Sequence, residues 1–361
     1  MNKSYCSLGL MSGTSADGVD ASVIETDGKT QYKVLGNRFF DYPFSLTHKI
    51  HKIKQQIISK SELIKHSKSL YLLEEELTNF HLIASKKMME RFKIDLIGFH
   101  GQTIYHNPKE KISKQIGSGK KLSNFTKKIV VYNFRENDLL NCGEGAPLAP
   151  IFHKLLVEQN KIKTPVTILN IGGIANITSI NNKFELSSSE DIGPGNCLID
   201  RWIRLKSDKK YDKKGLIARS GTVEKFILNQ SLNNFYNSKI SKKKSYDTND
   251  FDLSFVKELT LENGAATLTE FTADICSKKL INKNIYVCGG GRKNTFLLES
   301  INKKIPCKIN LIDEIGLDGD FIESQAFAYL AVRSYLKLPI SFPQTTGCKS
   351  PSTGGVIVRN F

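Results

Sequence analysis

The chain has 361 residues, of which 40% are hydrophobic and 24% charged, the composition of a globular protein rather than a disordered one. At about 150 residues per domain, this length predicts two domains. No apolar run approaches the roughly 20 residues that a membrane-spanning helix needs, and the N-terminus lacks the apolar stretch of a signal peptide. We therefore expect a cytoplasmic protein with no membrane partner. The seven cysteines form no CxxC pair, which argues against a disulfide framework and a zinc ribbon.

Lysine and arginine outnumber aspartate and glutamate by 52 to 36, a formal net charge of +16. A lysine-rich surface explains the excess, and attraction to an anionic partner such as a nucleotide, an acidic sugar or nucleic acid is the alternative. The lysine clusters are short and contain few aromatic residues, so we expect no nucleic-acid partner. These clusters are Lys206, Lys209, Lys210, Lys213 and Lys214, followed by Lys242, Lys243 and Lys244.

The first half of the chain alternates predicted strands with helical patterns. Strands are predicted at 5–11, 19–25, 31–40, 94–99 and 128–134. Helical spacing of apolar residues extends over 45–92, where Ser59 and Glu62 suggest a capping box, and a further helix is predicted at 149–158.

The second half repeats this beginning. Strands are predicted at 165–170 and 174–180 around a glycine turn, and at 284–288 before a second one. Residues 322–336 predict an amphipathic helix, and 205–250 is polar enough to include surface loops. Alternating strands and helices indicate α/β layers. We therefore predict two duplicated α/β domains, 1–160 and 161–361, with the boundary within about ten residues and a ligand cleft between the copies. The alternative for the C-terminal tail is that it packs back on the first domain.

Three glycine turns are candidates for phosphate or nucleoside binding, because glycine lets backbone N–H groups approach an anion closely. The first extends from Gly13 to Asp20, where Asp17 or Asp20 could hold Mg²⁺ through water. The second is Gly172-Gly173, and the third begins at Gly289-Gly290. The alternatives are a tight hairpin at Asp17-Gly18 and a flexible helix entry after Gly289.

Polar residues next to predicted strands and turns are candidates for catalysis and sugar binding. Asp191 precedes a Gly-Pro-Gly turn that would fix its carboxylate as a general base, although an Asx-type turn is the alternative. His100 and Gln102 follow a predicted parallel strand, at the sheet edge where α/β proteins bind ligands. For His100, a structural histidine with its hydrogen bonds satisfied inside the protein is the alternative. Arg135 could pair with a carboxylate or phosphate, and Glu323 begins the predicted C-terminal helix.

Eight runs in chain order, from about residue 8 to 355, resemble the anhydro-N-acetylmuramic acid kinase family. They are GLMSGTSADGVD, GFHGQTIYHNP, GEGAPLAP, NIGGIANIT, DIGPGNCLID, GAATLTEFTA, CGGGRKN and ESQAFAYLA. The resemblance implies two duplicated α/β domains of the sugar kinase, Hsp70 and actin type around an ATP cleft. It also implies an enzyme that uses ATP, Mg²⁺ and water to convert 1,6-anhydro-N-acetylmuramic acid into N-acetylmuramic acid 6-phosphate and ADP, in cell-wall recycling, and it suggests a homodimer.

The resemblance also implies roles for individual residues. Asp191 matches the family's catalytic base, which activates water while phosphorylation takes the place of protonating the leaving oxygen. The sugar-pocket candidates are His100, Gln102, Arg135 and Glu323. The candidates for ATP binding are Gly13, Thr14, Ser15, Ala16, Asp17, Gly18, Val19, Asp20, Gly172, Gly173, Gly289 and Gly290.

Three residues depart from the family pattern. Ile192 replaces the usual Thr after the base, Asn133 stands where an Asp usually precedes Phe-Arg, and Glu144 stands where Gln is usual. These departures affect hydrogen bonding around the site more than the class of reaction. A non-catalytic sugar or nucleotide sensor of the same fold is the alternative, and the retained Asp191 argues against it.

Overall fold

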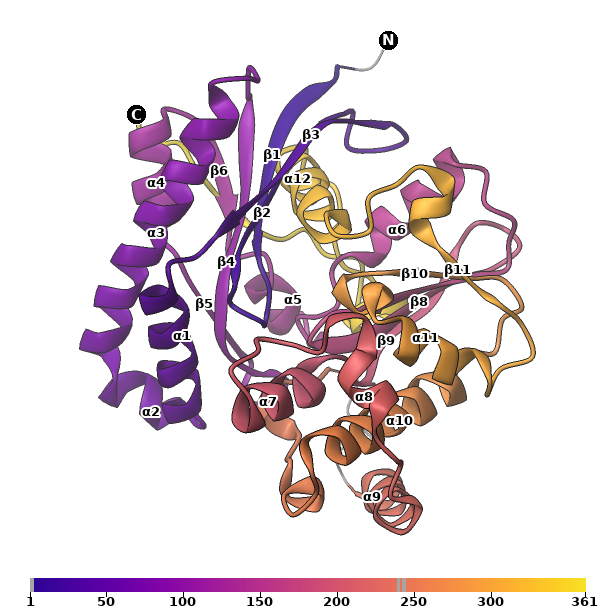
Figure 1. Cartoon of the computed structure of the whole chain (residues 1–361). Helices are drawn as coiled ribbons and strands as arrows, with labels where there is room; N and C mark the ends of the chain where they lie inside the picture. Colours follow the sequence, from indigo (N-terminus) through magenta and orange to yellow (C-terminus); the bar gives the residue numbers. More distant parts are fainter. Residues whose placement is uncertain (1–2, 239–240, 242–244) are drawn as a thin grey trace. The chain divides into compact units, whose positions relative to one another are not determined.

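The computed structural model describes residues 3–238, 241 and 245–361 (Figure 1). Lys242, Lys243 and Lys244 of the second lysine cluster lie outside the described residues. The chain divides into two compact units. Unit 1 comprises Met1–Lys161 with Asp320–Phe361, and unit 2 comprises Ile162–Gly319.

Unit 1 is built on a seven-stranded mixed sheet. Its strands are β1 (Tyr5–Ser12), β2 (Gly18–Thr26), β3 (Tyr32–Asp41), β4 (Leu96–Asn107), β5 (Ile112–Ile116), β6 (Ile129–Tyr132) and β12 (Val356–Val358). The spatial order is β12-β6-β4-β1-β2-β3, with β5 paired to β4. The neighbours β1, β4 and β6 are parallel, whereas β2, β3, β5 and β12 pair antiparallel.

Helices cover both faces of this sheet (Figure 1). They are α1 (Phe44–Gln56), α2 (Lys60–Lys65), α3 (Ser67–Met89), α4 (Gly119–Thr126), α5 (Glu136–Leu140), α6 (Pro150–Gln159), α12 (Ile322–Tyr335) and α13 (Pro343–Thr346). Leu8 and Leu10 of β1 belong to the same apolar cluster as residues of α1 and α3. Because successive strand residues face opposite sides, Gly9 faces the other layer, where a Cβ would collide with the backbone of α12 at Ser324.

The sequence predictions for unit 1 need four corrections. The helical pattern over 45–92 is divided into α1, α2 and α3. The capping box is wrong, because Ser59 makes no side-chain cap and its hydroxyl instead contacts Ser61. The predicted strand 128–134 ends early, since Asn133 has a left-handed φ of 56°. Helix α12 is not amphipathic, because it is buried on nearly all sides.

Unit 2 repeats the strand order of unit 1 on a five-stranded sheet. Its strands are β7 (Val166–Ile171), β8 (Ile174–Ile180), β9 (Leu186–Pro194), β10 (Ile285–Cys288) and β11 (Ile309–Leu311), in the order β11-β10-β7-β8-β9. As in unit 1, the first strand forms a hairpin on one side and parallel pairs on the other. The predicted duplicated α/β architecture is therefore confirmed.

In the described part of unit 2, five α-helices accompany the sheet. They are α7 (Cys197–Lys206), α8 (Leu216–Ser220), α9 (Lys225–Asn237), α10 (Leu261–Lys279) and α11 (Thr295–Asn302). The 205–250 segment contains α8 and α9 and, as predicted, loops, among them 207–212 and 221–224. None of the described helices is long and apolar enough to cross a membrane.

The second predicted domain, 161–361, is too long at its C-terminal end. Residues 320–361 group with unit 1, because α12 packs against β1, β2 and β4. The Ser7 hydroxyl, for example, donates a hydrogen bond of 2.8 Å to the Ala328 carbonyl. A contact between residues 321 positions apart leaves no local pattern in the sequence.

Candidate active site

In unit 1, the candidate residues lie along one edge of the sheet. Strands β1, β4 and β6 are parallel, so their carboxyl ends meet at this edge, where α/β proteins place ligands. The Gly13 turn follows β1, Gln102 pairs in register with Ser12, and Arg135 comes three residues after β6. His100 does not end its strand as predicted, since β4 continues to Asn107 by pairing with β5.

The first glycine turn is centred on Thr14 and Ser15. The Ala16 amide donates to the Gly13 carbonyl at 3.2 Å, and the Ser15 hydroxyl donates to Asp17 at 2.8 Å. Gly18 already belongs to β2, where a Cβ would collide with the Phe40 carbonyl, so an Asp-Gly hairpin turn is not formed. The space beside Gly13 is open except for the Ser15 hydroxyl. Thr14 is half-buried and Ser15 is exposed.

His100 and Arg135 form a pair in unit 1. The Arg135 guanidinium donates to His100 Nε2 at 2.9 Å from Nη2, and to the Gly145 carbonyl at 2.9 Å from Nη1. Since an arginine only donates, Nε2 must accept, and the imidazole proton resides on Nδ1, which donates to the Gly101 carbonyl at 2.8 Å. Burial, reinforced by the Arg135 cation, lowers the pKa of His100 to about 3. The imidazole is therefore neutral and both of its nitrogens have protein partners.

The other two unit 1 candidates differ in their surroundings. Gln102 is fully buried, and its side chain contacts the Gly13 turn. Glu323 lies in the first turn of α12, one helical turn before Phe327, whose ring packs on His100 at a centroid distance of 4.5 Å.

In unit 2, the Gly172-Gly173 turn is held by backbone groups. The amides of Asn196 and Gly195 donate to the carbonyls of Gly172 at 2.8 Å and Gly173 at 2.9 Å, respectively. The Cys197 amide also donates to Gly173, at 3.1 Å. A Cβ at Gly195 would collide with the Gly172 carbonyl, so this close approach requires glycine.

The third glycine turn contains three glycines in different surroundings. Gly289 has a φ of +79°, and a Cβ there would collide with the Asn170 side chain at the end of β7. A Cβ at Gly291 would collide with Ile171, whereas nothing lies within 4 Å of the Cβ position at Gly290. Gly289 and Gly291 are thus required by packing, and Gly290 alone leaves open space for a ligand. The turn leads into a 3₁₀ turn and then α11, as predicted for a helix entry.

Asp191 is a buried carboxylate near the end of strand β9. Asp191 pairs in register with Asn176 of β8. The predicted Gly-Pro-Gly turn after it is wrong at its first two residues, because Gly193 and Pro194 continue strand β9 by pairing with β8.

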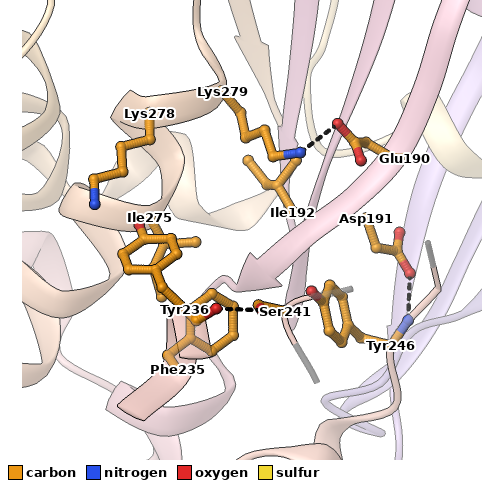
Figure 2. Close-up of a pocket in the computed structure, with 10 residues that line it drawn as sticks. All are labelled: Glu190, Asp191, Ile192, Phe235, Tyr236, Ser241, Tyr246, Ile275, Lys278 and Lys279. Carbon is orange, nitrogen blue, oxygen red and sulfur yellow. Dashed lines mark hydrogen bonds and ion pairs between the residues drawn. The ribbon is translucent and has the colours of Figure 1, made fainter. Parts of the chain in front are cut away.

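The Asp191 Oδ2 accepts a hydrogen bond of 2.9 Å from the Tyr246 backbone amide (Figure 2). Figure 2 also shows the neighbouring Glu190 directed to Lys279, with which it forms an ion pair of 2.8 Å. Two adjacent acids therefore have different surroundings, and the buried one has a fixed orientation.

Asp191 borders a hollow of about 130 Å³ within unit 2. Tyr246, Tyr236 and Lys278 line it, with the Lys278 ammonium 3.6 Å from the centre of the Tyr236 ring. Burial raises the pKa of Tyr246, whose ring packs against Phe251 at 5.3 Å. Nothing in the local sequence around residue 246 indicates its contact with Asp191, 55 positions earlier.

The described residues contain no group of three or more His, Cys, Asp or Glu side chains placed to hold a metal ion. A hydrated Mg²⁺ bound mainly through phosphates needs only one or two carboxylates from the protein. Asp17 is exposed on the Gly13 turn and Asp20 is half-buried on β2. Their exposure and their positions beside the turn are compatible with that mode of binding.

The three departures from the family pattern occupy different surroundings. Ile192 belongs to the apolar cluster of unit 2, and the Asn133 side chain donates to Glu136. Glu144 precedes Gly145, which is held by Arg135 and by the Asp138 carboxylate. None of the three replaces a candidate catalytic or glycine position.

Comparison of the sequence with known proteins identifies the family of this chain. The family profile described as anhydro-N-acetylmuramic acid kinase matches residues 5–360. The chain belongs to this family. The kinase of that name from Pelagibacter ubique (strain HTCC1062) is 52% identical, with 100% of both chains covered. The one from Zymomonas mobilis subsp. mobilis (strain ATCC 31821 / ZM4 / CP4) is 39% identical over 97% of this chain and 98% of its own.

Among solved structures, a ROK family glucokinase from Streptomyces griseus, in complex with glucose and AMPPNP, is 12% identical. It covers 90% of this chain and 99% of its own, with a TM-score of 0.42. Membership of the anhydro-N-acetylmuramic acid kinase family therefore rests on the sequence match along the whole chain.

Proposed function

We propose that this chain is an ATP-dependent kinase that hydrolytically opens the 1,6-anhydro ring of 1,6-anhydro-N-acetylmuramic acid and phosphorylates O6. The products are N-acetylmuramic acid 6-phosphate and ADP. The observation that carries the proposal is the buried Asp191 carboxylate, held by the Tyr246 amide in a chain that matches this kinase family from residue 5 to 360. A sensor of the same fold would have no need for a fixed buried carboxylate.

Asp191 acts as the general base in this proposal. It takes a proton from the water whose oxygen bonds to C1, while the C1–O6 bond breaks and O6 forms a bond to the γ-phosphorus. The bond from that phosphorus to the β–γ bridging oxygen breaks, and ADP leaves. A single carboxylate is sufficient because O6 is phosphorylated instead of protonated, in contrast to the carboxylate pair of ordinary glycosidases. The amide at Oδ2 fixes the orientation of the base.

Arg135 is the proposed partner of the sugar's lactyl carboxylate. Its guanidinium is oriented by His100 on one side and by the Gly145 carbonyl on another. A planar, permanently charged guanidinium is suited to a carboxylate. The role of His100 in this proposal is to orient Arg135, because both of its ring nitrogens have partners within the protein. Glu323, one turn before Phe327, remains a candidate for a sugar hydroxyl.

The ATP phosphates are assigned to the turns at Gly13 and Gly172, and the nucleoside to the open space beside Gly290. Asp17 or Asp20 would hold Mg²⁺ through water, and the cation would neutralise charge on the phosphates during transfer. In this proposal the enzyme acts in the cytoplasm, because ATP is available there. It also forms a homodimer. Light scattering coupled to size-exclusion chromatography tests the homodimer.

A coupled ADP-release assay with Mg-ATP, with and without the anhydro-sugar, tests the proposed function. Mass spectrometry of the sugar product is the decisive measurement. We expect sugar-dependent ADP release and a product heavier by one water and one phosphoryl group. Sugar binding without ADP release, by protein shown to be folded, would favour the sensor instead.

A further inference from the structure

The side chain of Gln102 is in contact with the Gly13 turn. Its Nε2 donates a hydrogen bond of 3.0 Å to the Gly13 carbonyl and a longer one of 3.4 Å to the Thr103 carbonyl. Its Oε1 accepts a hydrogen bond of 2.6 Å from the Ser12 hydroxyl. Gln102 is fully buried, and both ends of its side-chain amide form hydrogen bonds within the protein.

A chain of hydrogen bonds determines which way this amide points. The buried Tyr42 hydroxyl donates to Ser12 Oγ at 3.0 Å, so the Ser12 hydroxyl proton is available for Gln102 Oε1. Burial raises the pKa of Tyr42, which keeps its hydroxyl protonated and a donor. A backbone carbonyl only accepts, so the NH₂ end must face Gly13. The order Tyr42, Ser12, Gln102, Gly13 therefore leaves a single consistent set of donors and acceptors.

The orientation of the Gly13 carbonyl determines that of the next amide. In a planar trans peptide, the C=O and the following N–H point in opposite directions. The Gly13 oxygen accepts from the buried Gln102 side chain and from the Ala16 amide. The Thr14 N–H, at the carboxyl end of β1, is consequently directed away from both of these donors. An outward-facing amide in a glycine turn is a donor for an anion.

We propose that Gln102 is a positioning residue for nucleotide phosphate: it holds the Gly13 carbonyl so that the Thr14 amide faces the phosphate. This inference rests on the proposed function and deepens it. It replaces the sugar contact that resemblance suggests for Gln102 with a role in ATP binding. Ser12 and Tyr42 stabilise this orientation of the Gln102 amide through the hydrogen bonds described above.

Steady-state kinetics and calorimetric ATP binding of Gln102→Met and Gln102→Glu test the inference. We expect Gln102→Met to raise the KM for ATP and the Kd for ATP about tenfold, the effect of losing one buried hydrogen bond to the Gly13 carbonyl, which then keeps only the Ala16 amide as a donor. The KM for the anhydro-sugar should stay within about twofold. The matched control is Gln115→Met on β5, which removes hydrogen bonds to Thr103 and Ser113 but touches no part of the turn.

Gln102→Glu adds a pH signature that a purely structural role would not produce. A protonated glutamic acid can donate to the Gly13 carbonyl, whereas the ionised form repels it. Relative to wild type at each pH, the ATP defect of this variant should therefore shrink as pH falls from 8.5 to 6. The defect of Gln102→Met should be independent of pH.

A raised KM for the sugar with an unchanged KM for ATP would overturn the inference and leave the proposed function intact. Equal effects of Gln102→Met and Gln115→Met would also overturn it. If Gln102→Met fails to fold, Tyr42→Phe keeps the ring packing against Phe80 and should weaken ATP binding in the same direction by about two- to threefold. Calorimetry needs no turnover, so it tests the inference even if wild-type protein releases no ADP.

Discussion

The two units share a strand order but hold their first glycine turns in different ways. In unit 1, the carbonyl of Gly13 accepts from the neighbouring Ala16 amide and also from a side chain, that of Gln102, which lies 89 residues away. In unit 2, the carbonyls of Gly172 and Gly173 are bound by backbone amides of residues 195–197. A side-chain support can be removed by one substitution, whereas a backbone support is vulnerable only where a glycine allows the close approach. The two glycine turns therefore differ in their sensitivity to substitution, although their sequence motifs are similar.

The largest expected difference between the two units is in their stability at low pH. All seven histidines belong to unit 1, and burial lowers the pKa of His81 and His153 to about 4 and that of His100 to about 3. Between about pH 6.5 and 4 the unfolded chain binds protons that the folded one does not, so the free energy of unfolding falls as pH falls. Each histidine lowers the free energy of unfolding by up to about 1.4 kcal/mol per pH unit, so the three together lower it by up to about 4 kcal/mol per pH unit.

Hydrogen exchange of the backbone amides, measured in increasing urea at pH 7, 6 and 5, reports the stability of each unit separately. Amides of unit 1 should lose protection before those of unit 2. A parallel loss in both units would contradict the assignment of acid sensitivity to the buried histidines.

Substitution of Asp191 should remove the general base, which belongs to unit 2, and so lower the turnover. Asp191→Asn keeps the shape and the acceptor for the Tyr246 amide but removes the base, so turnover should fall by at least about 100-fold. ADP release at saturating substrates measures it. Glu190→Gln, which removes the partner of Lys279 on the adjacent residue, is the matched control and should remain near wild type. Near-normal turnover of Asp191→Asn would eliminate this residue as the base.

Alanine at two neighbouring glycines distinguishes packing from ligand binding. Gly289→Ala should destabilise the protein by about 1–3 kcal/mol, because its φ is +79° and its Cβ would meet Asn170. Gly290→Ala should leave the unfolding free energy within about 0.5 kcal/mol, because its Cβ position is open, yet raise the KM for ATP. Chemical denaturation and ATP kinetics measure both. An unchanged KM for ATP in Gly290→Ala would place the nucleoside elsewhere.

Arg135→Lys should have a smaller effect, confined to sugar binding by unit 1. A lysine loses the fork that contacts both His100 and Gly145, so we expect the KM for the anhydro-sugar to rise about tenfold, with turnover changed less. Wild type and variant should differ much less on an analogue without the lactyl group. An equal penalty on both sugars would show that Arg135 does not bind the carboxylate.

The sequence alone determined the repeated strand–turn–strand pattern and the positions of the glycine turns at Gly13, Gly172 and Gly289, although not the turn predicted at Gly193, which belongs to β9. These features are local: a buried strand needs a short apolar run, and a tight turn or close approach needs glycine. The predictions at 174–180 and around Gly172 agree closely with β8 and its turn. The motifs that identify the family are local for the same reason.

Only the tertiary structure decided which partners hold the candidate residues. The Tyr246 amide reaches Asp191 across 55 positions, and Gln102 reaches Gly13 across 89. Helix α12 was predicted to be amphipathic but is buried, because Gly9 and Gly98 let its backbone approach the sheet of unit 1. Such contacts depend on which elements pack together, and a pattern within one segment of sequence contains no information about that packing.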